Sequence, residues 1–121
     1  MHFLIVKNIV LIDPYCDIQT LVILSYKKKD IDLKVITSSK NRITDKLLNQ
    51  YIEKYGNIKI YINDNFHDRF LVLDKTMYFN LGTSINSAGK KISIVKKETG
   101  TKMMKFIDEE IDEIISSATN I

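Results

Sequence analysis

Residues 9–15, Ile9-Val10-Leu11-Ile12-Asp13-Pro14-Tyr15, decide the fold class. The first four are apolar, and such a short continuous run is typical of a strand buried on both faces of a sheet. The strand should stop at Asp13, because proline lacks a backbone donor and restricts the residue before it. A strand buried on both faces needs covering helices, so this stretch predicts an α/β protein.

The rest of the chain alternates between helix and strand patterns. Helices are predicted from the cap Asp17 to about Tyr26, from Thr44 to a stop at Gly56, and over a closing segment that carries Met103, Ile107, Ile111, Ile114 and Ile115 on one face. Strands are predicted at 33–36, 58–62, 70–73, 77–81 and 92–95. The pair around the turn Asp74-Lys75-Thr76 should form a hairpin or a central pair reached by another route, and residues 82–89 a loop or a short helix start. The predicted fold is a mixed β-sheet flanked by helices, a phospholipase D-like half-domain in the terms of the resemblance set out below.

Composition supports a single domain over residues 1–121. Of the 121 residues, 45% are hydrophobic, and only 4 Gly and 1 Pro are present, which excludes a disordered tail or a linker. The lone Cys16 can form neither an internal disulfide nor a thiolate zinc site, so we expect a buried thiol in a reducing compartment. No apolar run approaches the roughly 20 residues of a membrane helix, and no secretory signal is evident, so we expect a cytoplasmic protein without membrane contact.

Charge is distributed unevenly along the chain. All 18 Lys and Arg lie at or before Lys105, so residues 1–107 carry 18 − 10 = +8 and residues 108–121 carry −5. A body this basic attracts polyanions, of which nucleic acid is the commonest, although each lysine cluster taken alone also fits an ordinary solvated surface. The sequence therefore predicts nucleic acid, DNA or RNA, as a partner.

The strongest candidate for chemistry is the segment Phe66-His67-Asp68-Arg69-Phe70. On an extended strand, His67 and Arg69 project from one face about 7 Å apart, a spacing suited to gripping one phosphate. Further on, Gly82-Thr83-Ser84-Ile85-Asn86 offers hydroxyl and amide donors for phosphoryl oxygens.

These residues resemble the HKD signature of the phospholipase D superfamily. His67-x-Arg69-x4-Asp74, followed by Gly82-Thr83-Ser84-x-Asn86, is similar to His-x-Lys-x4-Asp-x6-Gly-Ser-x-Asn, and the order of elements over about residues 9–99 is similar too. The Phe-His-Asp-Arg-Phe variant resembles small single-motif prokaryotic members. Compared with the family pattern, Arg69 replaces lysine, and the segment before Ser84 is longer.

The resemblance implies a metal-independent phosphodiesterase, such as a nuclease, without a cofactor. His67 would attack phosphorus and form a phosphohistidine, while a second histidine protonates the leaving group. Arg69, Ser84 and Asn86 would hold the phosphate, Asp74 would complete the catalytic set, more as a structural partner than as a proton carrier, and Glu98 would orient His67.

The family site needs two motifs, and this chain has one, so the resemblance also implies a homodimer that shares its site across a two-fold axis. Two other hypotheses stay open. One is a catalytically impaired module of the same fold that binds phosphate or nucleic acid, and the other is a pure dimerisation domain.

Overall fold

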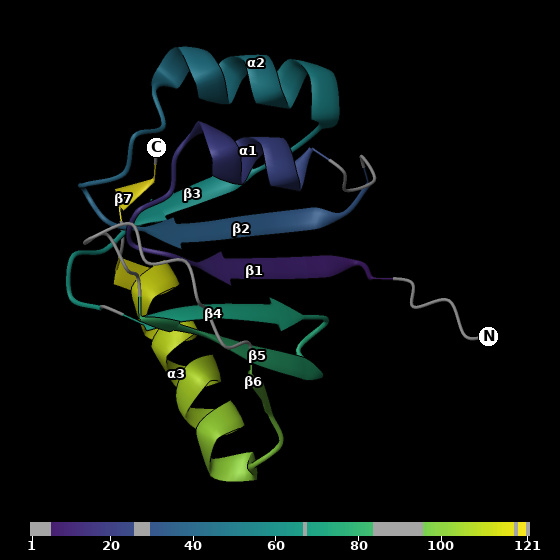
Figure 1. The fold of residues 1–121 in the computed structure, drawn as a ribbon, viewed down its shortest axis with the longest axis vertical. Coiled ribbons are helices and arrows are strands. Elements are labelled where there is room, and N and C mark those ends of the chain that lie inside the picture. The colour runs from purple at the N-terminus through teal and green to yellow at the C-terminus, as the bar shows by residue number, and fades with distance from the viewer. Residues whose placement is uncertain (1–5, 26–29, 67, 84–95, 118, 121) are drawn as a thin grey trace.

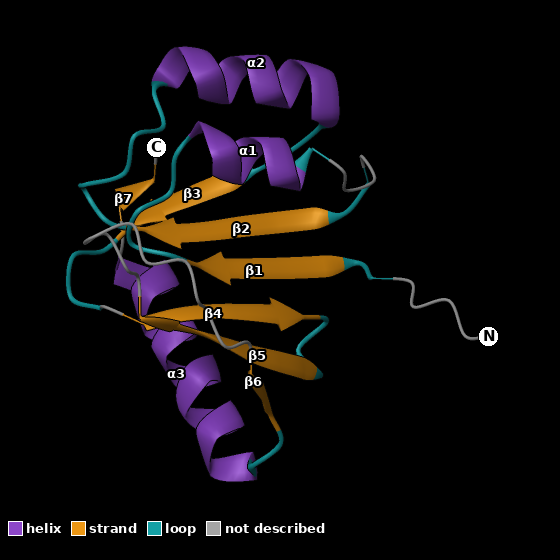
Figure 2. Cartoon of the chain, viewed as in Figure 1, coloured by secondary structure: helices purple, strands orange, loops and turns teal. Residues whose placement is uncertain are grey.

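The computed structural model describes residues 6–25, 30–66, 68–83, 96–117 and 119–120. In this part of the chain, seven strands form one sheet and three helices pack on its faces (Figures 1 and 2). The strands are β1 (Asn8–Ile12), β2 (Asp32–Thr37), β3 (Lys59–Ile62), β4 (Asp68–Leu73), β5 (Met77–Thr83), β6 (Lys96–Glu98) and β7 (Thr119–Asn120). The helices are α1 (Ile18–Leu24), α2 (Asp45–Tyr55) and α3 (Thr101–Ser117).

The sheet is mixed, with the strand order β6-β5-β4-β1-β2-β3-β7. β1, β2 and β3 are parallel, whereas β4 is antiparallel to β1 and the remaining pairs are antiparallel as well. The predicted fold class, a mixed sheet flanked by helices, is therefore confirmed. The run at residues 9–12 is the central strand, which explains why it is apolar on both faces.

Each face of the sheet has its own core. On one face, α1 and α2 cover β2 and β3, burying Leu21, Leu48 and Tyr51 against Leu33, Val35 and Ile60. On the other face, α3 buries Ile107, Ile111 and Ile114 against Ile12, Ile36, Tyr61, Val72 and Tyr78. The i, i+4, i+7 spacing of the three α3 isoleucines gives this helix its single apolar stripe.

The predicted helix caps are confirmed. Asp17 accepts hydrogen bonds from the amides of Gln19 (2.9 Å) and Thr20 (3.3 Å), and the Thr20 hydroxyl accepts in return from the Asp17 amide. Thr44 caps α2 through the amide of Leu47. Gly56 ends α2 with a φ of 98°, a value that glycine adopts without a steric penalty.

β4 and β5 form the predicted hairpin. Asp74 and Lys75 occupy its turn with φ values of 55° and 56°, as the two central residues of a type I′ turn require. The prediction of a loop or a short helix start from Gly82 is wrong at its first two residues, because β5 continues to Thr83. A register shift between Arg69 and Phe70 marks a bulge here, and Gly82 lies opposite Arg69 with a φ of 84°.

Other predictions have mixed outcomes. The strand predicted at 92–95 lies outside the described residues. The first helix was predicted to reach about Tyr26, but α1 ends at Leu24 with Ser25 as its C-cap. The short strands β6 and β7 were not predicted as they stand. Cys16 is fully buried, as expected, and this burial raises the pKa of its thiol to about 12. None of the helices in the described segments is long and apolar enough to cross a membrane.

Candidate functional site

Five strands have one of their ends on the same side of the sheet. β1, β2 and β3 end there, β4 begins there, and β5 returns to it (Figure 2). In open α/β sheets, ligands bind beyond the carboxyl ends of the parallel strands. We call this side of the sheet the carboxyl edge. β4, the strand that carries Arg69 of the predicted motif, begins there.

Backbone hydrogen bonds tie the loops after β1 and β2 together at the carboxyl edge. The amide of Asp13 donates to the Ile36 carbonyl (2.9 Å), and the amide of Arg42 donates to the Cys16 carbonyl (2.8 Å). The hydroxyl of Ser38 donates to the carbonyl of Pro14. The chain on either side of Tyr15 is thus held against the loop that carries Lys40 and Arg42.

These two loops enclose a hollow of about 360 Å³, lined by Tyr15, Asp17, Lys40 and Arg42. Tyr15 is half-buried, whereas Lys40 and Arg42 are exposed. Oδ1 of Asp17 caps α1, and the amides at the start of this helix offset part of the carboxylate charge. Two cations outnumber this one carboxylate, and the phenol ring of Tyr15 stands beside them. Such a set suits a phosphate next to a flat ring, because cations bind the oxygens and an aromatic face stacks.

The loop after β2 is also tied to the loop after β3. Asp64, after β3, accepts hydrogen bonds at Oδ1 from the amide (2.8 Å) and the hydroxyl (2.9 Å) of Ser39. These two bonds from Ser39, followed by the charge of Lys40, lower the pKa of the Asp64 carboxyl. The loop that carries Lys40 and Arg42 is therefore anchored on both sides.

Arg69 also lies at the carboxyl edge, in the second position of β4. Ile12 pairs with Phe70, so Asp13 and Arg69 are the next residues along the two adjacent strands. Phe70 and Val72 pack in the α3 core, so by alternation Arg69 projects on the face that α1 and α2 cover. Its side chain is half-buried, and Nη2 donates to the carbonyl of Leu81 (2.8 Å), the residue that the bulge leaves unpaired.

Three members of the predicted site lie outside the described residues: His67, Ser84 and Asn86. The predicted nucleophile and two of the predicted phosphate ligands therefore stay predictions. Of the predicted phosphate ligands, Arg69 is the one whose surroundings the structure describes.

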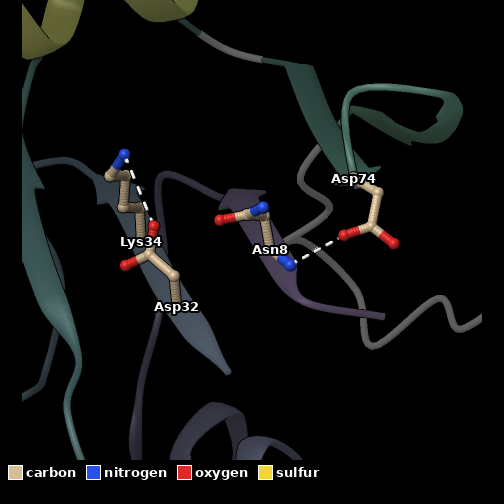
Figure 3. A network of polar contacts seen from close by, with 4 residues as sticks. All are labelled: Asn8, Asp32, Lys34 and Asp74. Atoms are coloured by element: carbon tan, nitrogen blue, oxygen red, sulfur yellow. Dashed lines mark hydrogen bonds and ion pairs between the residues drawn. The ribbon is translucent and has the colours of Figure 1, made fainter. Parts of the chain in front are cut away.

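Asp74 is placed away from this edge, in the hairpin turn at the other end of β4. Six residues of extended chain separate it from Asp68, or roughly 20 Å. Its Oδ1 accepts hydrogen bonds from the amides of Lys7 and Asn8, each 2.8 Å long, and its own amide donates to the Asn8 carbonyl (2.9 Å). Figure 3 shows the carboxylate against the start of β1. These contacts are those of a structural partner, the role expected for Asp74 over that of a proton carrier. Its place in the catalytic set stays a prediction.

Glu98 is also distant from the start of β4. It ends β6 opposite Tyr78, which in turn pairs with Val72. Val72 is four residues from Asp68, or roughly 13 Å along the strand. Glu98 is nearly buried, at 9% exposure, and this register keeps it away from the start of β4. Its role in orienting His67 stays a prediction.

The hollow at Lys40 and Arg42 was not predicted from the sequence. A usable signal was present: Lys40 and Arg42 follow within six residues of the strand predicted at 33–36, and Tyr15 follows the strand predicted at 9–12. Across the described segments, no three His, Cys, Asp or Glu side chains gather as a metal-binding group.

Comparison with known proteins finds a similarity of fold. No protein-family model matches the chain, and no curated protein matches it. Among solved structures, the chain is similar to TrmBL2, an archaeal chromatin protein whose structure shows a novel mode of DNA binding. The TM-score is 0.61 at 16% sequence identity. The alignment covers 96% of this chain and 47% of that one, so the chain spans about half the length of TrmBL2. At this identity, the likeness concerns the fold.

Proposed function

We propose that this domain binds nucleic acid at the carboxyl edge of the sheet, through the phosphate backbone. The observation that carries the proposal is the hollow in which Lys40 and Arg42 stand beside the ring of Tyr15. The anchored loops hold the backbone at the two cations in place, so less loop entropy is lost when a phosphate binds. Arg69, on the same edge, extends the positive surface toward β4.

Two further observations support nucleic acid over other anions. Residues 1–107 carry a charge of +8, which favours a polyanion over a single phosphate. In addition, the fold resembles that of TrmBL2, a chromatin protein with a described mode of DNA binding. An aromatic ring beside cationic side chains that contact the phosphate backbone is a common arrangement in proteins that bind single-stranded nucleic acid without sequence preference.

The test is fluorescence anisotropy with labelled single- and double-stranded DNA over a series of salt concentrations. We expect Lys40→Ala and Arg42→Ala to weaken binding and to reduce the salt slope by about 1 each. Lys102→Ala is the matched control, because it removes one positive charge from an exposed site on α3, away from the carboxyl edge. Equal weakening by all three variants would mean that only bulk charge matters, and the proposed site would be wrong.

The phosphodiesterase implied by the sequence resemblance is the second candidate, and the position of Arg69 at the carboxyl edge favours it. In this mechanism His67 forms a phosphohistidine and a second subunit supplies the general acid. It requires a homodimer, so the native mass measured by sedimentation must be twice 14.0 kDa. It also requires DNA cleavage in excess EDTA that His67→Ala abolishes. Salt-sensitive binding without products leaves the binding module as the function.

A further inference from the structure

The α3 face of the sheet contains a second cavity, separate from the hollow at Lys40 and Arg42. It has a volume of about 400 Å³ and lies between the start of β4 and the middle of α3. This volume falls within the usual range for small-molecule sites, about 300–1,000 Å³. None of its lining residues takes part in the proposed nucleic-acid site.

Three phenylalanine rings from separate segments line this cavity. Phe66 precedes β4, Phe70 lies within it, and Phe106 projects from α3. Phe66 and Phe70 are half-buried and pack against the α3 core, which fixes their positions. Phe106 is different, because 52% of its surface is exposed. An exposed ring beside two fixed rings leaves aromatic surface available to a ligand.

The charged residues that line the cavity are both acidic. Asp68 comes from β4 and Glu110 from α3, so the carboxylates approach from two different walls. Among the residues that the structure describes, no hydrogen bond or ion pair joins either carboxylate to another group. Phe106 and Glu110 are four residues apart on α3, which places them on the same side of the helix. The chain as a whole has a charge of +3, so this local acidity runs against its average.

We infer that this cavity binds a small organic cation with an alkyl-substituted ammonium centre. Ring faces attract such a centre through their quadrupole, and this is how aromatic cages recognise quaternary ammonium groups. The two carboxylates supply the opposite charge, while the apolar floor at Ile12 and Ile107 accepts the alkyl groups. A hydrated metal ion would gain nothing from the rings, and an anion would be repelled by Asp68 and Glu110.

The test compares choline with 3,3-dimethyl-1-butanol, which has the same shape but no charge, by calorimetry on the full chain. We expect choline to bind with a dissociation constant of roughly 1 mM, the value for a ligand of its size. Its neutral counterpart should bind at least about tenfold more weakly. Potassium chloride at equal ionic strength controls for salt effects.

Three variants locate the site. Phe106→Leu keeps an apolar side chain but removes the ring, and it should weaken choline binding about three- to thirtyfold. Glu110→Gln should weaken it by a similar factor. Glu113→Gln removes a charge from an exposed position on the same helix, outside the cavity, and should change nothing. Phe106 and Glu110 are both exposed, so these variants should fold, which circular dichroism can verify.

Two results would overturn the inference. If the neutral compound binds as tightly as choline, the cavity is only an apolar pocket. If Phe106→Leu and Glu110→Gln bind choline like the parent chain, the cation is held elsewhere. Neither result affects the proposed nucleic-acid site, since Lys40 and Arg42 lie at a different position in the fold.

Discussion

Substitutions at Asp74 separate a structural role from a role in phosphate chemistry. Both amide hydrogen bonds reach the same oxygen, Oδ1, and the residue itself has a φ of 55°. The carboxylate thus contributes an acceptor and a charge, and the residue adopts a left-handed conformation that Asp and Asn tolerate better than Ala. Replacing it with Asn, Gly and Ala removes these contributions in different combinations.

The size of each loss follows from these contacts. A hydrogen bond to a charged group contributes about 1.5–3 kcal/mol, but both bonds here are exposed to solvent, so we take about 2 kcal/mol for the pair. Asp74→Asn keeps the acceptor and loses the charge, which should cost about 1 kcal/mol or less. Asp74→Gly loses both bonds, at about 2 kcal/mol. Asp74→Ala also strains the left-handed backbone, and its total should be about 3 kcal/mol.

Thermal unfolding followed by circular dichroism measures this order. For a chain of this length, 1 kcal/mol corresponds to about 4 °C in Tm. We therefore expect decreases of about 4, 8 and 12 °C for Asn, Gly and Ala. The structural assignment would be refuted if Asp74→Ala melted with the parent, or if Asp74→Asn removed DNA binding while leaving Tm unchanged.

Three further predictions concern the core. Ile107→Ala leaves a cavity at a fully buried position on the sheet-facing side of α3, so denaturant titration should show a loss of about 2–5 kcal/mol in the free energy of unfolding. A loss below about 1 kcal/mol would mean that α3 is not packed on the sheet. Burial and then the Asp108 carboxylate, 2.8 Å from its hydroxyl, raise the pKa of Tyr78 to about 12. The contribution of the Tyr78 hydroxyl to the free energy of unfolding is therefore complete below pH 10 and is lost as the pH rises from 10 toward 12. In denaturant titrations across this range, the Tyr78→Phe variant should lose less stability than the parent chain. The Cys16 thiol, with a pKa of about 12, should react with a disulfide reagent only after denaturation; fast reaction of the native protein would contradict its burial.

Much of the fold was predictable, because local patterns specify it. The apolar run at 9–12 indicated a central strand, Asp17 and Thr44 marked helix starts, and Gly56 marked a helix end. Each of these signals acts within a few residues of where it stands, through backbone geometry or a capping bond. The alternation expected of the strand that carries Arg69 is also observed, because Phe70 and Val72 share the α3 face of β4.

The candidate sites were less predictable, because their members are distant in sequence. Tyr15 and Arg42 line one hollow only because β1 and β2 pair in parallel and bring two loops together. Asp74 fits a family spacing, yet its partners are Lys7 and Asn8, which the pairing of β1 with β4 places beside the turn. Spacing along the chain specifies residue types, and it does not specify which strand lies next to them.

The sequence by itself determined the α/β class, the helix starts at Asp17 and Thr44, the helix end at Gly56 and the basic character of most of the chain, since these depend on neighbours in sequence and on composition. Only the tertiary structure decided which charges meet. Strand order places Lys40 and Arg42 beside Tyr15, and the packing of α3 places Glu110 across from Asp68. Contacts of this kind arise from long-range pairing and packing, which a local pattern does not specify.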